Sequence, residues 1–61
     1  MDITELLDAL TLYGKVIIAK YDSQWSVRIS YGKGSEWMHN SSLEIALIML
    51  LEYCRVVYLN S

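Results

Sequence analysis

The chain has 61 residues, 54% of them hydrophobic, and its five basic and seven acidic residues give a formal net charge of −2. This length leaves room for one domain over residues 1–61, and so small a domain buries only about 60% of the surface that its unfolded chain exposes. One cysteine, Cys54, and one histidine, His39, exclude an intrachain disulfide and a Cys/His zinc site, and no cofactor is expected. Stability therefore has to come from dense apolar packing or from self-association.

Neither nucleic acid nor a membrane is an expected partner. The five basic residues are scattered along the chain, whereas binding to nucleic-acid phosphates needs clustered cations. The longest apolar run, residues 45–51, has seven residues, far fewer than the ~20 that cross a bilayer. The chain starts with acidic residues at Asp2 and Glu5, unlike a signal peptide. Together with the single cysteine, these features predict a cytoplasmic location.

Residues 2–13 predict a short amphipathic helix. Its apolar residues recur at helical spacing: Ile3, Leu6, Leu7 and Leu10. Asp2 and Glu5 stand three residues apart, as in a capping box at a helix start. Gly14 follows the helix, where a left-handed residue commonly ends it.

A β-hairpin is predicted over residues 15–21 and 24–31, because both segments are rich in β-branched and aromatic residues and flank a turn at 22–23. A tight turn there gives three expected pairs: Ile18 with Val27, Val16 with Ile29, and Lys20 with Trp25. A register shifted by one residue would bring Ile17 and Ala19 to the core face instead. The first register is preferred because it buries bulkier side chains.

A third strand is predicted over residues 35–39, after a turn at 32–34. A three-residue loop there pairs Ile29 with Trp37 and places Trp37 in the core. A four-residue or shifted loop would place Met38 inside instead. In the preferred register the outer face of the sheet has one aromatic residue and one arginine, at Tyr21 and Arg28.

A second helix is predicted from Leu43 to about Tyr58, with Ser41 and Glu44 at capping-box spacing. The alternative for its end is a fourth strand over residues 56–60. One face of the helix is expected in the core: Leu43, Ala46, Leu47, Leu50, Cys54 and Val57. A helix that is apolar over most of its circumference should be buried on more than one side. The surplus apolar residues are therefore the predicted partner or dimer interface: Ile45, Ile48, Met49, Tyr53 and Val56.

These elements predict an α+β fold of order α-β-β-β-α, a three-stranded antiparallel meander with both helices packed on one face. The order is similar to that of the double-stranded-RNA-binding domain, although many unrelated folds share it. That family has a lysine-rich start to its second helix, whereas residues 40–44 here have no positive charge. Binding of double-stranded RNA is therefore not expected.

No catalytic, cofactor-binding or metal-binding residue is predicted. Residues 32–35 are interpreted as a hairpin turn rather than a phosphate loop, because the stretch is short and joins two strands. His39 is interpreted as a strand-end residue and Cys54 as a buried structural thiol.

The composition predicts a non-catalytic protein-interaction module that forms a homodimer through the second helix. Such a module would act as an adaptor, regulator or inhibitor of a larger protein, a character typical of small phage proteins. The alternative is single-stranded nucleic-acid binding by aromatic and basic side chains of the sheet, with Tyr21 and Arg28 as its candidate residues.

Overall fold

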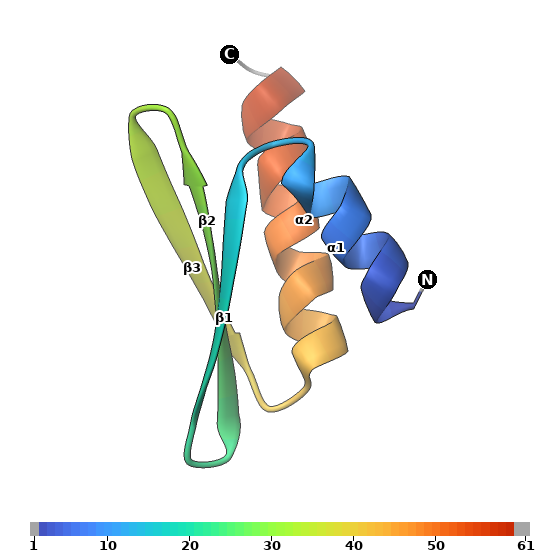
Figure 1. Ribbon diagram of the computed structural model, residues 1–61, viewed down its shortest axis with the longest axis vertical. Helices are drawn as coiled ribbons and strands as arrows, with labels where there is room; N and C mark the ends of the chain where they lie inside the picture. The colour runs from blue at the N-terminus through green and yellow to red at the C-terminus, as the bar shows by residue number, and fades with distance from the viewer. Residues whose placement is uncertain (1, 60–61) are drawn as a thin grey trace.

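The computed structural model describes residues 2–59 and has five elements in the predicted order (Figure 1). They are α1 (Ile3–Thr11), β1 (Lys15–Tyr21), β2 (Gln24–Tyr31), β3 (Gly34–Asn40) and α2 (Leu43–Leu59). The strands form one antiparallel sheet in the order β1-β2-β3, and both helices lie on one side of it. The predicted fold is confirmed. The segment 56–59 is helical, so the fourth-strand alternative is wrong there, and residue 60 lies outside the described residues.

The start of α1 follows the predicted cap. Asp2 has an extended backbone, and its carboxylate accepts a hydrogen bond from the Glu5 N–H at 2.8 Å. This bond satisfies one of the backbone donors that a helix start leaves without a partner.

The role predicted for Gly14 at the end of α1 is wrong. The helix ends at Leu12 in a right-handed conformation, and Gly14 does not have a positive φ. Glycine is needed there for a different reason. The chain passes so close to β2 that a Cβ atom on Gly14 would overlap the backbone carbonyl oxygen of Ser30.

The first hairpin has the expected register. Val16 pairs with Ile29, Ile18 with Val27, and Lys20 with Trp25. The Lys20 Nζ atom lies 5.0 Å from the centroid of the Trp25 ring, within the range of a cation–π contact. Asp22 begins the turn with a φ of 56°, a conformation that aspartate tolerates better than most residues.

The preferred register of the second hairpin is wrong by one residue. Tyr31 pairs with Gly34, so the turn contains only Gly32 and Lys33, and Gly32 has a φ of 35°. Because side chains alternate between faces, the shorter turn exchanges the two faces of β3. Met38 pairs with Val27 and packs against the core, as the shifted-loop alternative proposed, and Trp37 is directed to the outer face.

The core lies between the sheet and the helices. Its buried residues are Leu6, Leu10, Val27, Ile29, Ala46, Leu47, Leu50, Leu51 and Cys54. Helix α2 packs across β2 and β3, and α1 packs mainly on α2. Leu51 is buried although it was not expected in the core. Val57, which was expected there, is more than one-third exposed because it lies in the last turns of α2, beyond the main core cluster.

The cap of α2 is Ser42 rather than Ser41. The Ser42 Oγ atom accepts a hydrogen bond from the Ile45 N–H at 3.3 Å, and the Ser42 N–H donates to the Asn40 side chain at 2.9 Å. The Asn40 bond holds the turn that leads from β3 into α2.

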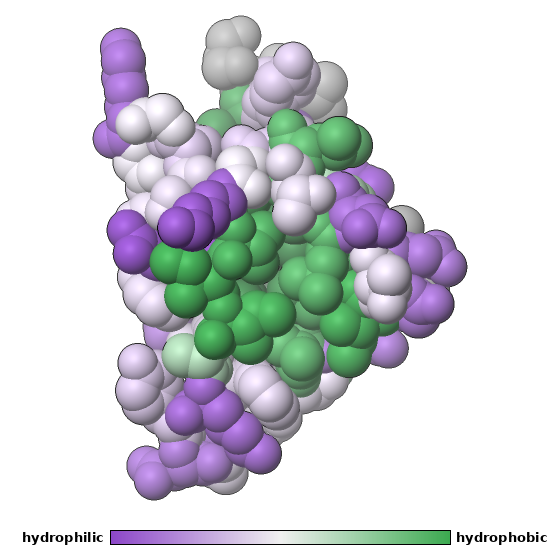
Figure 2. All heavy atoms as spheres, viewed as in Figure 1, coloured by the Kyte–Doolittle hydropathy of each residue, from purple (hydrophilic) through white to green (hydrophobic). Residues whose placement is uncertain are grey.

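The strand β1 is covered only in part by α1. Ile18 on the inner face of β1 and Ile3 on α1 are each more than one-third exposed. Figure 2 shows hydrophobic residues gathered over β1 and α1 on this side of the molecule. The first helix is too short to cover the whole length of the strand.

Candidate functional site

Four large apolar side chains form an exposed line along α2. We call them the α2 strip: Ile45, Ile48, Met49 and Val56, with exposed fractions between 36% and 57%. At about 100° per residue they lie on the side of the helix opposite its buried residues. Tyr53, which was grouped with them, is half-buried instead, and its hydroxyl lies 3.4 Å from that of Tyr31.

Three charged residues lie within or beside the α2 strip. Glu52 lies within its angular range, and Glu44 and Arg55 lie along one flank, near opposite ends of the helix. All three are exposed. The strip therefore combines apolar side chains with charges of opposite sign at its two ends.

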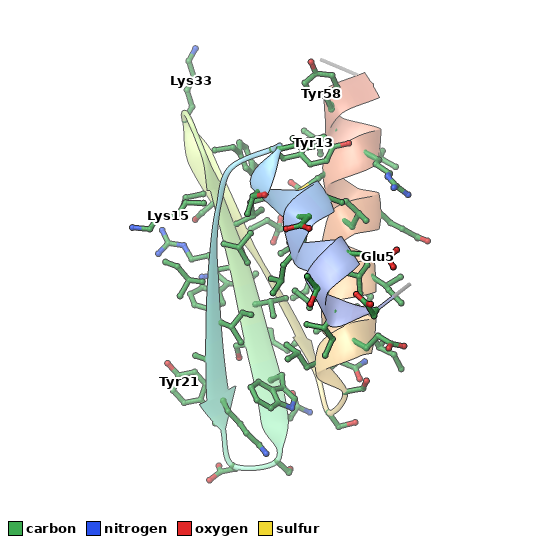
Figure 3. All side chains as sticks on the ribbon, turned by 45° about the vertical axis from the view of Figure 1, so that its right-hand side comes forward. Glu5, Tyr13, Lys15, Tyr21, Lys33 and Tyr58 are labelled. Atoms are coloured by element: carbon green, nitrogen blue, oxygen red, sulfur yellow. The ribbon has the colours of Figure 1, made fainter. Side chains whose placement is uncertain are left out.

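The outer face of the sheet contains a second group of side chains, three of them exposed and one, Arg28, half-buried. We call it the sheet platform: Tyr21, Arg28, Trp37 and His39. Arg28 and Trp37 are direct cross-strand partners, with the Arg28 Cζ atom 5.7 Å from the centroid of the Trp37 ring. The Trp37 and His39 rings are parallel within 5°, with centroids 6.1 Å apart. Tyr21 lies on β1 and points away from the helices (Figure 3).

His39 is held in place by a buried serine. The Ser26 Oγ atom lies 2.7 Å from the His39 Nδ1 atom, across the β2–β3 pair. Ser26 is only 4% exposed although it belongs to the outer face, so its neighbours cover it. The hydrogen bond satisfies the buried hydroxyl and fixes the plane of the imidazole ring beside Trp37.

Arg28 is partly desolvated and has no anionic partner. Its Nε atom is buried without a hydrogen-bond partner, and Arg28 forms no ion pair among residues 2–59. The guanidinium group instead packs against Trp37. A partly buried cation without a counter-ion favours an anion supplied by a ligand.

The charges of the protein are divided between its two layers. The sheet and its turns hold four of the five basic residues: Lys15, Lys20, Arg28 and Lys33. The helices and the cap of α1 hold five of the seven acidic residues: Asp2, Glu5, Asp8, Glu44 and Glu52. By the strand register, the outer face of the sheet holds Lys15 and Arg28 and no acidic side chain. The net charge of −2 therefore conceals a positively charged sheet face.

A cavity of about 370 Å³ lies between the β2–β3 turn and the C-terminal half of α2. Its lining residues are Tyr13, Tyr31, Gly32, Lys33, Tyr53, Cys54, Val57 and Tyr58. The Tyr13 and Tyr58 rings meet edge to face with centroids 5.8 Å apart, and Figure 3 shows these two side chains next to each other. The wall is largely aromatic, with Lys33 as its one charged side chain.

Two titratable groups at the cavity, Tyr53 and Cys54, are held in their neutral forms. Hydrogen bonding to Tyr31, and then to Glu36, raises the pKa of Tyr53 far above its ordinary value. Burial raises the pKa of the Cys54 thiol. A protonated phenol and a protonated thiol are poor bases and poor nucleophiles at neutral pH, so the cavity offers apolar contact rather than reactive groups.

Residues 2–59 contain no group of three or more His, Cys, Asp or Glu side chains placed to hold a metal ion. Neither of the two described helices has the length and apolarity required to cross a membrane.

Sequence reasoning anticipated the α2 strip but only half of the sheet platform. The predicted outer face contains Tyr21 and Arg28 but not Trp37 and His39, because the predicted turn is one residue longer than the observed one. A usable signal was present, since glycine is favoured at the first position of a two-residue hairpin turn, the position that Gly32 occupies.

Comparison of the chain with known protein families, curated proteins and solved structures finds no match.

Proposed function

We propose that this chain is a non-catalytic protein-interaction module that forms a homodimer through the α2 strip. In this role it acts in the cytoplasm as an adaptor, regulator or inhibitor of a larger protein. The observation that supports the proposal is the line of four exposed apolar side chains on α2. Contiguous apolar surface that stays exposed in a small soluble domain is typical of a protein contact.

An antiparallel pair of α2 helices fits the order of residues along the strip. Ile45 lies near the start of the helix and Val56 near its end. A two-fold axis through the middle of the helix therefore places Ile45 against the partner's Val56. An interface of this kind is self-complementary, as two-fold contacts are.

The charges that border the strip favour the same arrangement. In an antiparallel pair, Arg55 lies near the partner's Glu44, and the reverse contact forms by symmetry. A parallel pair would instead place Glu52, which lies within the strip, beside the partner's Glu52, and would leave Arg55 and Glu44 without partners of opposite charge. Like charges in contact destabilise an interface, so the antiparallel pair is the expected one.

The expected dimer dissociates on dilution. Stable interfaces contain about 20–30 residues on each side, whereas the strip consists of four large apolar side chains. A weak, reversible dimer also leaves the strip available for exchange with another apolar helix, which is how an adaptor or inhibitor would use it.

Sedimentation over a concentration series tests the proposal. The unmodified chain should pass from monomer to dimer as concentration rises, and Met49→Asp should stay monomeric at every concentration. Leu12→Asp is the matched control, because Leu12, the residue that follows α1, is 85% exposed and lies outside the strip. This variant should dimerise like the unmodified chain.

A charge exchange tests the orientation. Glu44→Arg and Arg55→Glu should each weaken the dimer, and the double variant should restore it. A folded chain that stays monomeric throughout, or a Met49→Asp variant that still dimerises, contradicts the proposal.

A further inference from the structure

The outer face of the sheet suggests a ligand of its own, independent of any contact made by α2. We propose that the sheet platform binds single-stranded nucleic acid. Bases would stack on the aromatic side chains of the platform, and phosphates would contact Arg28 and Lys15. The sheet platform and the α2 strip lie on opposite layers of the molecule, so one can be occupied without blocking the other.

The first support is the exposed aromatic surface. Trp37 is 40% exposed and Tyr21 64% exposed, and no described element covers this face of the sheet. Ile17 pairs with Arg28 and adds an exposed apolar side chain to the same row. Stacking on aromatic side chains contributes about 1–3 kcal/mol per base and tolerates any sequence.

The second support is the charge on this face. Arg28 has no anionic partner among the described residues, and the outer face has no acidic side chain to compete with a phosphate. Lys15 lies one strand away, opposite Ser30, and points away from the helices (Figure 3). The acidic residues are concentrated in the helical layer, which directs a polyanion to the sheet side of the molecule.

The third support is that the platform is already ordered without a ligand. Arg28 is packed on Trp37, and His39 is fixed by its hydrogen bond to Ser26. Side chains that are held in place lose little conformational entropy when a ligand binds.

A single strand fits this surface better than a duplex or an acidic peptide does. The base faces of a duplex are stacked on one another and cannot reach a flat sheet, whereas a single strand presents them. An acidic peptide would satisfy Arg28 and Lys15 but would leave Trp37 and Tyr21 unused. With two phosphate contacts, the logarithm of the binding constant should fall with the logarithm of salt concentration with a slope of about −1.4.

The test is a titration of a short fluorescein-labelled poly-dT strand with the full chain, followed by fluorescence anisotropy. Binding should be micromolar at low salt and should weaken as salt is added. Trp37→Ala and Arg28→Ala should each weaken binding by about tenfold, the effect of losing one stacked base or one charged contact.

Two further variants keep the test valid if a substitution at Arg28 or Trp37 prevents folding. Tyr21 and Lys15 are exposed, so Tyr21→Ala and Lys15→Ala should fold normally and still weaken binding. Lys33→Ala is the charge-matched control, because Lys33 lies in the β2–β3 turn, away from the platform (Figure 3). It should bind like the unmodified chain.

Several outcomes would overturn the proposal. One is no change of anisotropy at low salt, and another is an equal loss of affinity in Lys33→Ala and Lys15→Ala. The others are binding of a duplex, or of a labelled poly-glutamate, as tight as the binding of the single strand. The dimer proposal is tested separately, since Met49→Asp should bind the strand as the unmodified chain does.

Discussion

Gly14 and Ser30 approach each other so closely that the space for a side chain at Gly14 is already filled by the carbonyl oxygen of Ser30. The contact joins the segment after α1 to the far end of β2, and both sides of it are main chain. Neither side can turn away as a flexible side chain would.

Gly14→Ala should therefore destabilise the protein by about 1–3 kcal/mol, the usual cost of forcing an extra carbon into a packed site. Urea denaturation followed by circular dichroism measures the change. Gly34→Ala is the control, because the nearest atoms to a Cβ there are those of the Tyr31 ring at 3.7 Å, an ordinary contact distance. A Gly14→Ala variant as stable as the unmodified chain would show that β2 and the α1 end are not in contact in solution.

Ser26→Ala should lower stability by about 1 kcal/mol, because it removes the hydrogen bond to His39. It should also free the imidazole ring, and NMR of the His39 ring protons should report that change. Ser35→Ala is the comparison, since Ser35 is exposed on the same face and has no side-chain hydrogen bond in the described structure. Unchanged His39 signals in Ser26→Ala would mean that stacking on Trp37 alone fixes the ring.

The free energy of unfolding should fall as the pH is raised into the alkaline range. Folding raises the pKa of Cys54 by burial and that of Tyr53 by hydrogen bonding to Tyr31. The folded chain therefore keeps protons that the unfolded chain releases, so rising pH favours unfolding. The loss should begin above the ordinary thiol pKa of about 8.5 and continue past the ordinary phenol pKa of about 10.

Urea denaturation at a series of pH values checks this dependence. Cys54→Ala should remove the part that begins near the thiol pKa, and Tyr53→Phe the part at higher pH. If the double variant loses stability with pH as steeply as the unmodified chain, other groups are responsible.

Most of the fold follows from local patterns. The 3.6-residue spacing of apolar residues defines both helices, and the alternation after the Asp22–Ser23 turn sets the register of β1 and β2. Local chemistry is sufficient there because a one-residue slip would bury smaller side chains.

The second hairpin could not be placed in the same way. Gly32 and Gly34 allow turns of two or three residues, and Trp37 and Met38 are both apolar, so either could face the core. The length of the turn decides which of the two faces the core. It therefore also decides whether Trp37 and His39 belong to the sheet platform. Local sequence patterns also cannot predict the close approach of Gly14 to Ser30, because Ser30 lies sixteen residues further along the chain.

The α2 strip was the part of the candidate surface that the sequence could predict. Its residues share one side of a long helix, and helical periodicity alone places them there. Helical periodicity gives the direction of the Tyr53 side chain around the helix axis and therefore groups it with the strip. It does not show that Tyr31, from β2, packs against Tyr53.

The strand β1 has one edge that pairs with no other strand among residues 2–59, and both of its faces include apolar side chains. A segment of this kind is a template for intermolecular strand pairing and fibril growth. Its lysines, Lys15 and Lys20, stand near the two ends of this edge, where their charges repel a second copy of the same strand. We therefore expect these two charges to hinder aggregation, and a modification that neutralises them, such as acetylation, should increase aggregation without altering the core.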